Sequence, residues 1–222
     1  MPCDNENSQI LRIHLSNIKI NTNIDANNAP FSQSPLRFAT PAEWVNTVMA
    51  DFDTFLQDHA AAEKKASSMA MSMISHYPNR IALVEAMAEL AIEELNHFRE
   101  VVKWLHRRDI QLTADNKDHY VIAMRKHMSN GSDVYLLDRL LIGGIIEARG
   151  CERFGMIAKA LPSGDLQNFY HAITESEAKH YQLFIDLAHQ YFDADIVNNR
   201  LDTLLDAEAK ITADLLISAA LH

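Results

Sequence analysis

The sequence of 222 residues contains only two cysteines, Cys3 and Cys151, and no Cys-x-x-Cys motif. This scarcity argues against a disulfide framework, a cysteine zinc site and a rubredoxin unit. The chain also lacks an apolar run of membrane-spanning length, and its start, MPCDNENSQI, is polar and acidic, unlike a secretory signal. We therefore expect a cytoplasmic protein that is not exported and has no membrane partner.

An excess of positive charge is also absent. The sequence has 20 Lys and Arg residues and 30 Asp and Glu residues, which gives a formal net charge of −10 at pH 7. This balance argues against broad, non-specific binding of nucleic acid, although it leaves room for a local basic patch.

The length suits one domain with a sizeable core. Residues 1–35 are rich in Asn and Ser, and we expect them to form a flexible N-terminal extension to a domain at 36–222. Within the extension, the alternating stretch LRIHLSNIKI is compatible with an edge strand or with a sticky arm.

Beyond Pro35, apolar residues recur in steps of three and four, which predicts helices. The segment TPAEW indicates a helix start, with Thr40 as N-cap, and Pro78 is expected to end that first helix. The other predicted helices cover about 80–108, 116–129, the two long segments on either side of LPSGD, and about 195–221. An extended connection between the second and third long helices favours an all-α, ferritin-like four-helix bundle with additional helices.

Two of these helices carry the same polar motif on an apolar face. Glu94 and His97 lie in AIEELNHFRE, and Glu177 and His180 lie in TESEAKHYQLF. Residues three apart share one face of a helix, so each Glu-x-x-His motif directs a carboxylate and an imidazole toward one point. Burial of an unpartnered carboxylate is costly, so these side chains require a compensating positive charge.

Each motif is preceded by a further core glutamate on the neighbouring helix. Glu63 precedes Glu94 by 31 residues and Glu147 precedes Glu177 by 30, which indicates a duplicated helix pair. A single Glu-x-x-His is usually a solvated pair, but four carboxylates and two imidazoles on four helices are typical of di-iron and di-manganese proteins. Mixed oxygen and nitrogen ligands suit iron or manganese, and we expect two iron ions.

Other residues near these positions have two interpretations. His59 lies one turn before Glu63 and could either hydrogen-bond that glutamate or be an ordinary core histidine. Gly143 and Gly150 are expected either to clear space for dioxygen or substrate beside the metals or to allow close helix packing. The glutamates that fall off the core stripe and read as surface charge are Glu85, Glu93, Glu100, Glu152 and Glu175.

From about residue 36 to residue 222, the sequence resembles the tRNA-(2-methylthio-N6-isopentenyladenosine) hydroxylase family, the MiaE type. The resemblance lies in LRFATPAEWV, AIEELNHF, GGIIEARGCERF and ESEAKHY. The ligand pattern alone indicates only a ferritin-like di-iron protein, and the contexts PAEWV, IEARGCERF and EAKHY make the narrower match.

The resemblance implies a monooxygenase that hydroxylates the isopentenyl group of a modified adenosine in the anticodon region of tRNA. It also implies dioxygen as co-substrate and two electrons from an external reductase or other donor. The iron ligands that it implies are Glu63, Glu94, His97, Glu147, Glu177 and His180.

A tRNA substrate requires local positive charge. The residues that we expect to contact tRNA are Lys103, Arg107 and Arg108 at one helix end, and Arg125, Lys126 and His127 on the connecting helix. Alternatives close to the ligands are Lys64, Lys65, Arg149 and Arg153.

Two other functions could use the same metal site. A ferritin-like di-iron oxidase would act on a small molecule and would not bind tRNA. An iron storage or detoxification protein would assemble into a shell, so its size in solution would distinguish it. The sequence itself sets no oligomeric state.

Overall fold

The computed structural model describes residues 34–222, and all of its regular elements in that range are helices. The all-α prediction is therefore confirmed for this part of the chain, whereas the stretch LRIHLSNIKI lies outside it. The helices are α1 (Ala42–Ala50), α2 (Phe52–His76), α3 (Ile81–Arg107), α4 (His119–Arg125), α5 (Ser132–Ala160), α6 (Asp165–Tyr191) and α7 (Ala194–Asp214). None of these helices is long and apolar enough to cross a membrane.

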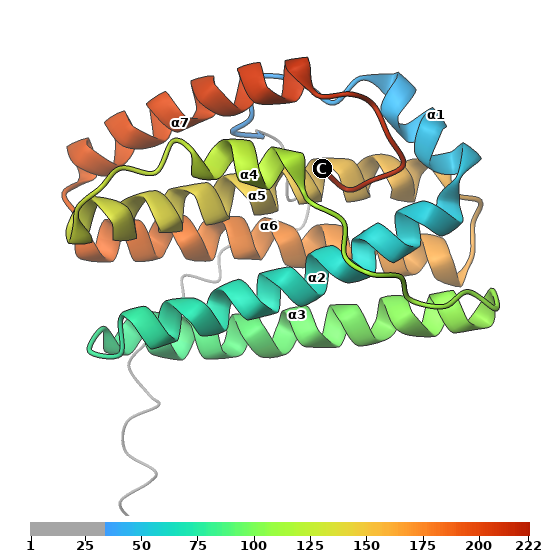
Figure 1. Ribbon diagram of the computed structural model, residues 1–222, viewed down its shortest axis with the longest axis horizontal. Helices are drawn as coiled ribbons and strands as arrows, with labels where there is room; N and C mark the ends of the chain where they lie inside the picture. Colours follow the sequence, from blue (N-terminus) through green and yellow to red (C-terminus); the bar gives the residue numbers. More distant parts are fainter. Residues whose placement is uncertain (1–33) are drawn as a thin grey trace, which may run out of the picture. The chain divides into compact units, whose positions relative to one another are not determined.

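The four long helices α2, α3, α5 and α6 form the bundle (Figure 1). Short connections make α2 and α3 one hairpin and α5 and α6 the other, and the two hairpins pack together. The longer connection between α3 and α5 contains α4, while α7 lies along α5. This arrangement turns the apolar stripes of all four long helices toward a common interior.

The interior consists of two apolar clusters with a polar layer between them. One cluster contains Met73, Leu83 and Leu140, and the other contains Phe55, Leu105 and Phe154. Along each long helix, the polar positions predicted from the sequence fall between the residues of these two clusters. The apolar clusters hold the helices together and thereby fix the spacing of the polar layer.

The first long helix predicted from the sequence is broken in two. Asp51 has φ −137° and ψ 61°, and its carboxylate accepts a hydrogen bond from Thr54 N to start α2. Thr40 does not cap α1, because its hydroxyl instead donates to Glu152 at 2.6 Å. Glu152 was expected to be surface charge, but its side chain is partly buried. Its carboxylate holds the chain that enters α1.

Two helices are shorter than predicted. The predicted helix at 116–129 forms only over α4, and the predicted helix at 195–221 ends with α7. Residues 215–222 instead return toward α4 (Figure 1). Their backbone is held by side chains of other elements: Trp44 Nε1 donates to Ala220 O at 3.0 Å, and Leu221 N donates to Asp58 Oδ2 at 2.7 Å. These tertiary hydrogen bonds replace helical ones.

A buried ion pair joins α5 to α7. Arg149 and Glu208 both have fully buried side chains, and Arg149 Nε donates to Glu208 Oε1 at 2.9 Å. Tyr120 and Thr212 donate to the same carboxylate oxygen at 3.2 and 2.8 Å. The guanidinium also donates to Phe38 O at 2.8 Å. The network thus connects the bundle to α4, α7 and the chain before α1.

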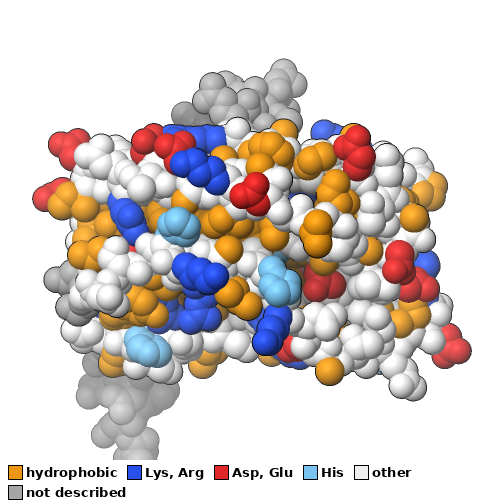
Figure 2. Space-filling view, turned by 45° about the horizontal axis from the view of Figure 1, so that its top comes forward, with side chains coloured by type: hydrophobic (Ala, Val, Ile, Leu, Met, Phe, Trp, Pro, Cys, Tyr) orange, Lys and Arg blue, Asp and Glu red, His pale blue; other side chains and the backbone are white. Residues whose placement is uncertain are grey.

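Charge is unevenly distributed on the surface that carries α4 and α7 (Figure 2). Lys, Arg and His side chains gather over its middle and left, whereas acidic side chains lie mostly along the upper edge and on the right. A net charge of −10 is thus compatible with a local basic area. This area is relevant to any polyanionic ligand.

Candidate metal centre

Each long helix of the bundle contributes to one cluster of carboxylates and imidazoles. The residues are Glu63 from α2, Glu94 and His97 from α3, Glu147 from α5, and Glu177 and His180 from α6. The three-residue spacing in α3 and α6 turns both side chains of each motif inward. The structure therefore brings together all six residues that the sequence pattern singled out.

The six side chains form two overlapping groups of possible metal ligands. One group is Glu63, Glu94, His97 and Glu177, and the other is Glu94, Glu147, Glu177 and His180. Within each group, one potential ligand atom per residue lies within 4.8 Å of all the others. Glu94 and Glu177 belong to both groups, so each can serve as a bridge between two cations.

The imidazoles direct their Nδ1 atoms toward the carboxylates. His180 Nδ1 lies 2.9 Å from Glu94 Oε1, and His97 Nδ1 lies 3.5 Å from Glu94 Oε2 and 3.6 Å from Glu63 Oε2. Within the described part of the chain, both Nδ1 atoms and Glu94 Oε1 are buried, and despite these close approaches none of them makes a contact with hydrogen-bond geometry. Such orphaned atoms are costly, and cations would satisfy them, so the donor set fits a pair of metal ions.

Several carboxylates lie close together in the cluster, so their charges repel one another. Burial raises the pKa of Glu94, and the charge of Glu63 raises it further. Burial and neighbouring carboxylates hold the pKa of Glu147 well above its usual range. Burial opposes protonation of the imidazoles, but the carboxylates outweigh it and raise the pKa of His97 to about 10 and that of His180 to about 12. A cation that binds these ligands must therefore compete with protons.

His59 contacts the cluster through Glu63. His59 Nε2 donates to Glu63 Oε1 at 2.6 Å, and its Nδ1 lies 3.1 Å from the hydroxyl of Tyr170, which donates to it. Burial alone would raise the pKa of Glu63, but the hydrogen bond from His59 and the contact with His97 lower it to about 2. The contact therefore keeps this carboxylate ionised and oriented.

Sequence reasoning missed Glu93, which was interpreted as surface charge. Its side chain is 58% exposed, yet Glu93 Oε2 lies 2.7 Å from His180 Nε2 on the neighbouring helix. A carboxylate at the second nitrogen of an imidazole orients the ring and fixes its tautomer. The available signal was the position of Glu93 four residues before His97, at the edge of the same helical face.

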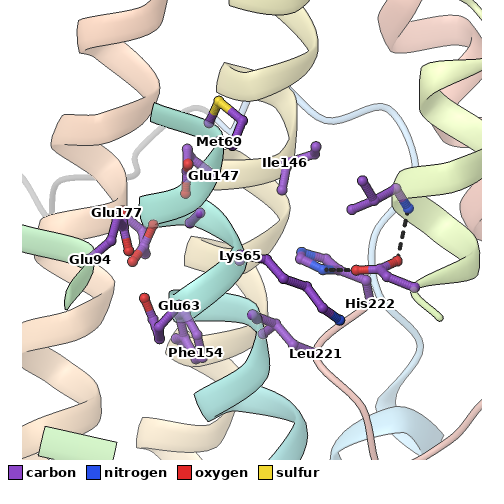
Figure 3. A pocket seen from close by; sticks show the side chains of 15 residues that line it. Glu63, Lys65, Met69, Glu94, Ile146, Glu147, Phe154, Glu177, Leu221 and His222 are labelled. Atoms are coloured by element: carbon purple, nitrogen blue, oxygen red, sulfur yellow. Dashed lines mark hydrogen bonds and ion pairs between the residues drawn. The ribbon is translucent and has the colours of Figure 1, made fainter. Parts of the chain in front are cut away.

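A cavity of about 140 Å³ lies beside the cluster, with walls that include α2 and α5 (Figure 3). All four carboxylates of the cluster line it: Glu63, Glu94, Glu147 and Glu177. Most of the remaining wall is apolar and includes Met69, Ile146 and Phe154. In the view of Figure 3, Lys65 and His222 lie on the side away from Glu94 and Glu177. This cavity suits an apolar group that must reach the carboxylates.

Gly143 and Gly150, expected either to clear space beside the metals or to allow close helix packing, have different roles. Gly150 lines the cavity, and a Cβ atom there would meet only Phe154, at 3.7 Å. Gly143 does not line it, and a Cβ atom there would lie 2.9 Å from Phe184 Cε1. Close packing of α5 against α6 therefore explains Gly143, whereas Gly150 contributes to the cavity.

Alanine substitutions should separate these roles. Gly143→Ala is expected to destabilise the metal-free protein by about 1–3 kcal/mol, because Phe184 must move. Gly150→Ala is expected to be neutral or stabilising by up to about 1 kcal/mol, because alanine favours the helix and no close contact opposes it. Urea unfolding measures both, with Gly150→Ala as the control. Equal stabilities of the two variants would contradict this assignment.

The basic residues predicted to contact tRNA occupy two separate places. Lys103, Arg107 and Arg108 are at the end of α3, whereas Arg125 and Lys126 are at the end of α4, in a different part of the molecule (Figure 1). In the first group, Lys103 pairs with Glu100 at 2.6 Å, Arg108 pairs with Asp53 at 2.5 Å, and Arg107 lies over the Trp104 ring. Arg125, Lys126 and the neighbouring His127 are exposed.

Two of the alternative basic residues are not surface groups. Arg149 is fully buried, and Arg153 is 5% exposed. Arg149 pairs with Glu208, and Arg153 Nη1 donates to Leu221 O at 2.5 Å. Their prediction as tRNA contacts was wrong, because both point into the protein and stabilise the fold. Lys64 and Lys65 remain near the surface, bonded to Asp115 and to the backbone of Asn116.

The bundle and its paired ligand groups define a ferritin-like carboxylate protein of the di-metal class. The fold is similar to that of a solved structure named "Protein 43 with aldehyde deformylating oxygenase activity from Synechococcus", with a TM-score of 0.79 and 32% identity. The similarity covers 83% of this chain and 92% of that chain.

The sequence relatives make the assignment narrower. The model of the family described as tRNA-(MS[2]IO[6]A)-hydroxylase (MiaE) matches residues 28–222, and the chain belongs to this family, as its sequence motifs predicted. Two relatives are named tRNA 2-(methylsulfanyl)-N(6)-isopentenyladenosine(37) hydroxylase. The one from Pseudomonas putida is 40% identical over 71% of this chain and 77% of its own length. The one from Salmonella typhimurium is 37% identical over 63% of this chain and 51% of its own length.

Proposed function

We propose that this protein is a non-haem di-iron monooxygenase that hydroxylates the isopentenyl group of 2-methylthio-N6-isopentenyladenosine in tRNA. Its co-substrate is dioxygen, and an external donor or reductase supplies two electrons. The observation that carries the proposal is the pair of ligand groups that share Glu94 and Glu177. These groups lie at the wall of a largely apolar cavity, in a chain that belongs to this family.

The cluster would hold one iron ion with Glu63 and His97 and the other with Glu147 and His180, and Glu94 and Glu177 are available to both. Bound iron would supply the activation of dioxygen needed for oxygen insertion into a C–H bond. The protein would position the ligands: the contact of His59 with Glu63 and that of Glu93 with His180 orient one ligand in each group.

The cavity would hold the isopentenyl tail. Met69, Ile146 and Phe154 provide apolar contacts and limit the access of water to the reacting carbon. The base would remain nearer to the surface, where a base of the anticodon region can be unstacked at modest cost. Substrate positioning by these walls would select which carbon faces the ligands.

The phosphates of the tRNA would lie on the face that carries α4. Asp118 and Val121, at the start of this helix, line the cavity, and the exposed Arg125 and Lys126 are on the same short helix. Phosphate contacts need positive charge close to the reaction site. The position of α4 therefore favours Arg125 and Lys126 over the three basic residues at the end of α3.

A single-turnover assay tests the proposal. Iron-loaded, chemically reduced protein is mixed with dioxygen and tRNA carrying the isopentenylated nucleoside, and the nucleosides are analysed by mass spectrometry. The expected result is a gain of one oxygen on that nucleoside, with none in metal-free protein and none on tRNA that lacks the isopentenyl group. Absence of the gain with iron bound would reject the proposal.

A small-molecule oxidase is the second candidate function, because the similar Synechococcus structure is named for aldehyde deformylating oxygenase activity. An apolar cavity beside the cluster would also accept such a substrate. Dioxygen consumption without any change in tRNA would favour this candidate. A shell seen by light scattering would instead favour iron storage.

A further inference from the structure

The cavity beside the metal ligands adjoins a larger groove. The groove has a volume of about 850 Å³ and is lined by parts of α2, by residues of the α3–α4 connection and by residues 214–222. Asp118 and His222 line both the inner cavity and the outer groove. These two residues therefore form a shared wall between a small, largely apolar space and a larger space with more polar residues.

His222 is held firmly at this wall. Its Nδ1 lies 3.1 Å from Asp118 Oδ2, and its ring stacks on Tyr120 with a centroid distance of 5.0 Å and an interplanar angle of 15°. Asp118 is itself fixed, because its Oδ1 accepts from Val121 N at 2.8 Å. The side chain of His222 is only 6% exposed. Such a ring presents its remaining nitrogen in a defined direction.

That remaining nitrogen has no partner. His222 Nε2 is buried and makes no hydrogen bond with the residues that the structure describes. Asp118 already accepts from Val121 N, and a carboxylate can only accept, so His222 Nδ1 donates to Asp118 Oδ2. In the neutral ring, Nε2 then carries a lone pair. A buried acceptor without a partner, on a side chain that lines a cavity, indicates a donor on the ligand.

We propose that His222 Nε2 accepts a hydrogen bond from the N6–H of the modified adenosine and is a specificity-determining residue. This inference rests on the proposed function. In an N6-isopentenyl adenosine, N6 carries one hydrogen and joins the polar base to the apolar tail. With the tail in the inner cavity and the base in the outer groove, N6–H lies at the wall formed by Asp118 and His222. In the view of Figure 3, His222 is on the opposite side of the pocket from Glu94 and Glu177. The tail would point from His222 toward these two carboxylates.

The test compares two anticodon stem-loop RNAs in the single-turnover assay. One carries 2-methylthio-N6-isopentenyladenosine, and the other carries an analogue in which an ether oxygen replaces N6–H with little change in size. The wild-type protein is expected to hydroxylate the ether analogue about 10- to 100-fold more slowly, because the buried acceptor then faces an oxygen. An equal rate on the two RNAs would overturn the proposal without any variant.

His222→Phe and His222→Gln complete the experiment. His222→Phe keeps a ring that can stack on Tyr120 but lacks the acceptor, so its rate on the natural nucleoside should fall about 10- to 100-fold and the preference between the RNAs should vanish. His222→Gln has an amide oxygen that can accept the bond and should keep part of the preference. Iron content and circular dichroism show that each variant is loaded and folded.

The outcomes separate this proposal from the function on which it rests. Hydroxylation of neither RNA by iron-loaded wild-type protein would reject the proposed function, and this inference with it. Hydroxylation of the natural nucleoside with an undiminished preference in His222→Phe would reject only the role of His222.

Discussion

Glu177→Ala is expected to reduce hydroxylation of tRNA to less than about one thousandth of the wild-type rate. Glu177 belongs to both groups of possible ligands, so its loss removes a potential ligand from each group. Loss of an outer residue that only orients a ligand typically costs about 10- to 100-fold, and loss of a shared ligand should cost more. Iron per chain, measured by elemental analysis, should fall well below two.

The fold should survive this substitution. In the metal-free protein the carboxylates repel one another, so removal of one relieves part of that strain, and circular dichroism should remain helical. Glu175→Ala is the matched control, because Glu175 is an exposed glutamate two residues earlier in α6. Retention of two iron ions and of activity by Glu177→Ala would reject the ligand assignment.

Arg149→Met is expected to destabilise the metal-free protein by about 3–5 kcal/mol, the usual cost of removing one partner of a buried ion pair. Glu208 would remain fully buried with only the Tyr120 and Thr212 hydroxyls as donors, and one of its oxygens already lacks a partner in the described residues. The contacts of Arg149 with the chain before α1 would also be lost. Urea unfolding followed by circular dichroism measures the change in free energy.

Two comparisons make this second prediction specific. The double variant Arg149→Met/Glu208→Leu should recover much of the lost stability, because no uncompensated charge remains in the interior. Lys103→Met removes a cation from an exposed pair with Glu100 and should change stability by no more than about 1 kcal/mol. A loss below about 1 kcal/mol in Arg149→Met would mean that the network does not hold α7 to the bundle.

Family membership adds to what the ligand groups or the cavity beside them support alone. The two ligand groups are common to many di-metal bundles and do not specify a substrate. The largely apolar cavity beside them suits a small apolar reacting group, and the family relation then suggests which nucleoside carries that group. The sequence, the site and the relatives together lead to tRNA hydroxylation.

The sequence by itself determined the helical bundle and the six residues that meet at its centre. Glu94 and His97 are three residues apart in one helix, so their common direction follows from local geometry alone. The motif repeats at Glu177 and His180, and a further glutamate lies about one helix before each copy. Helices of similar length are enough to bring these residues to the same level of the bundle. Periodicity is a local property, and sequence shows it directly.

Only the tertiary structure decided which side chains lie beside that centre. Glu93 reaches His180 from another helix, Arg149 is buried by α7, and His222 reaches the cavity wall because residues 215–222 leave the helix and fold back. Gly143 and Gly150 share a helix and differ only in what packs against them. These contacts join residues far apart in the chain, so their geometry depends on how whole helices pack and has no local periodic signal.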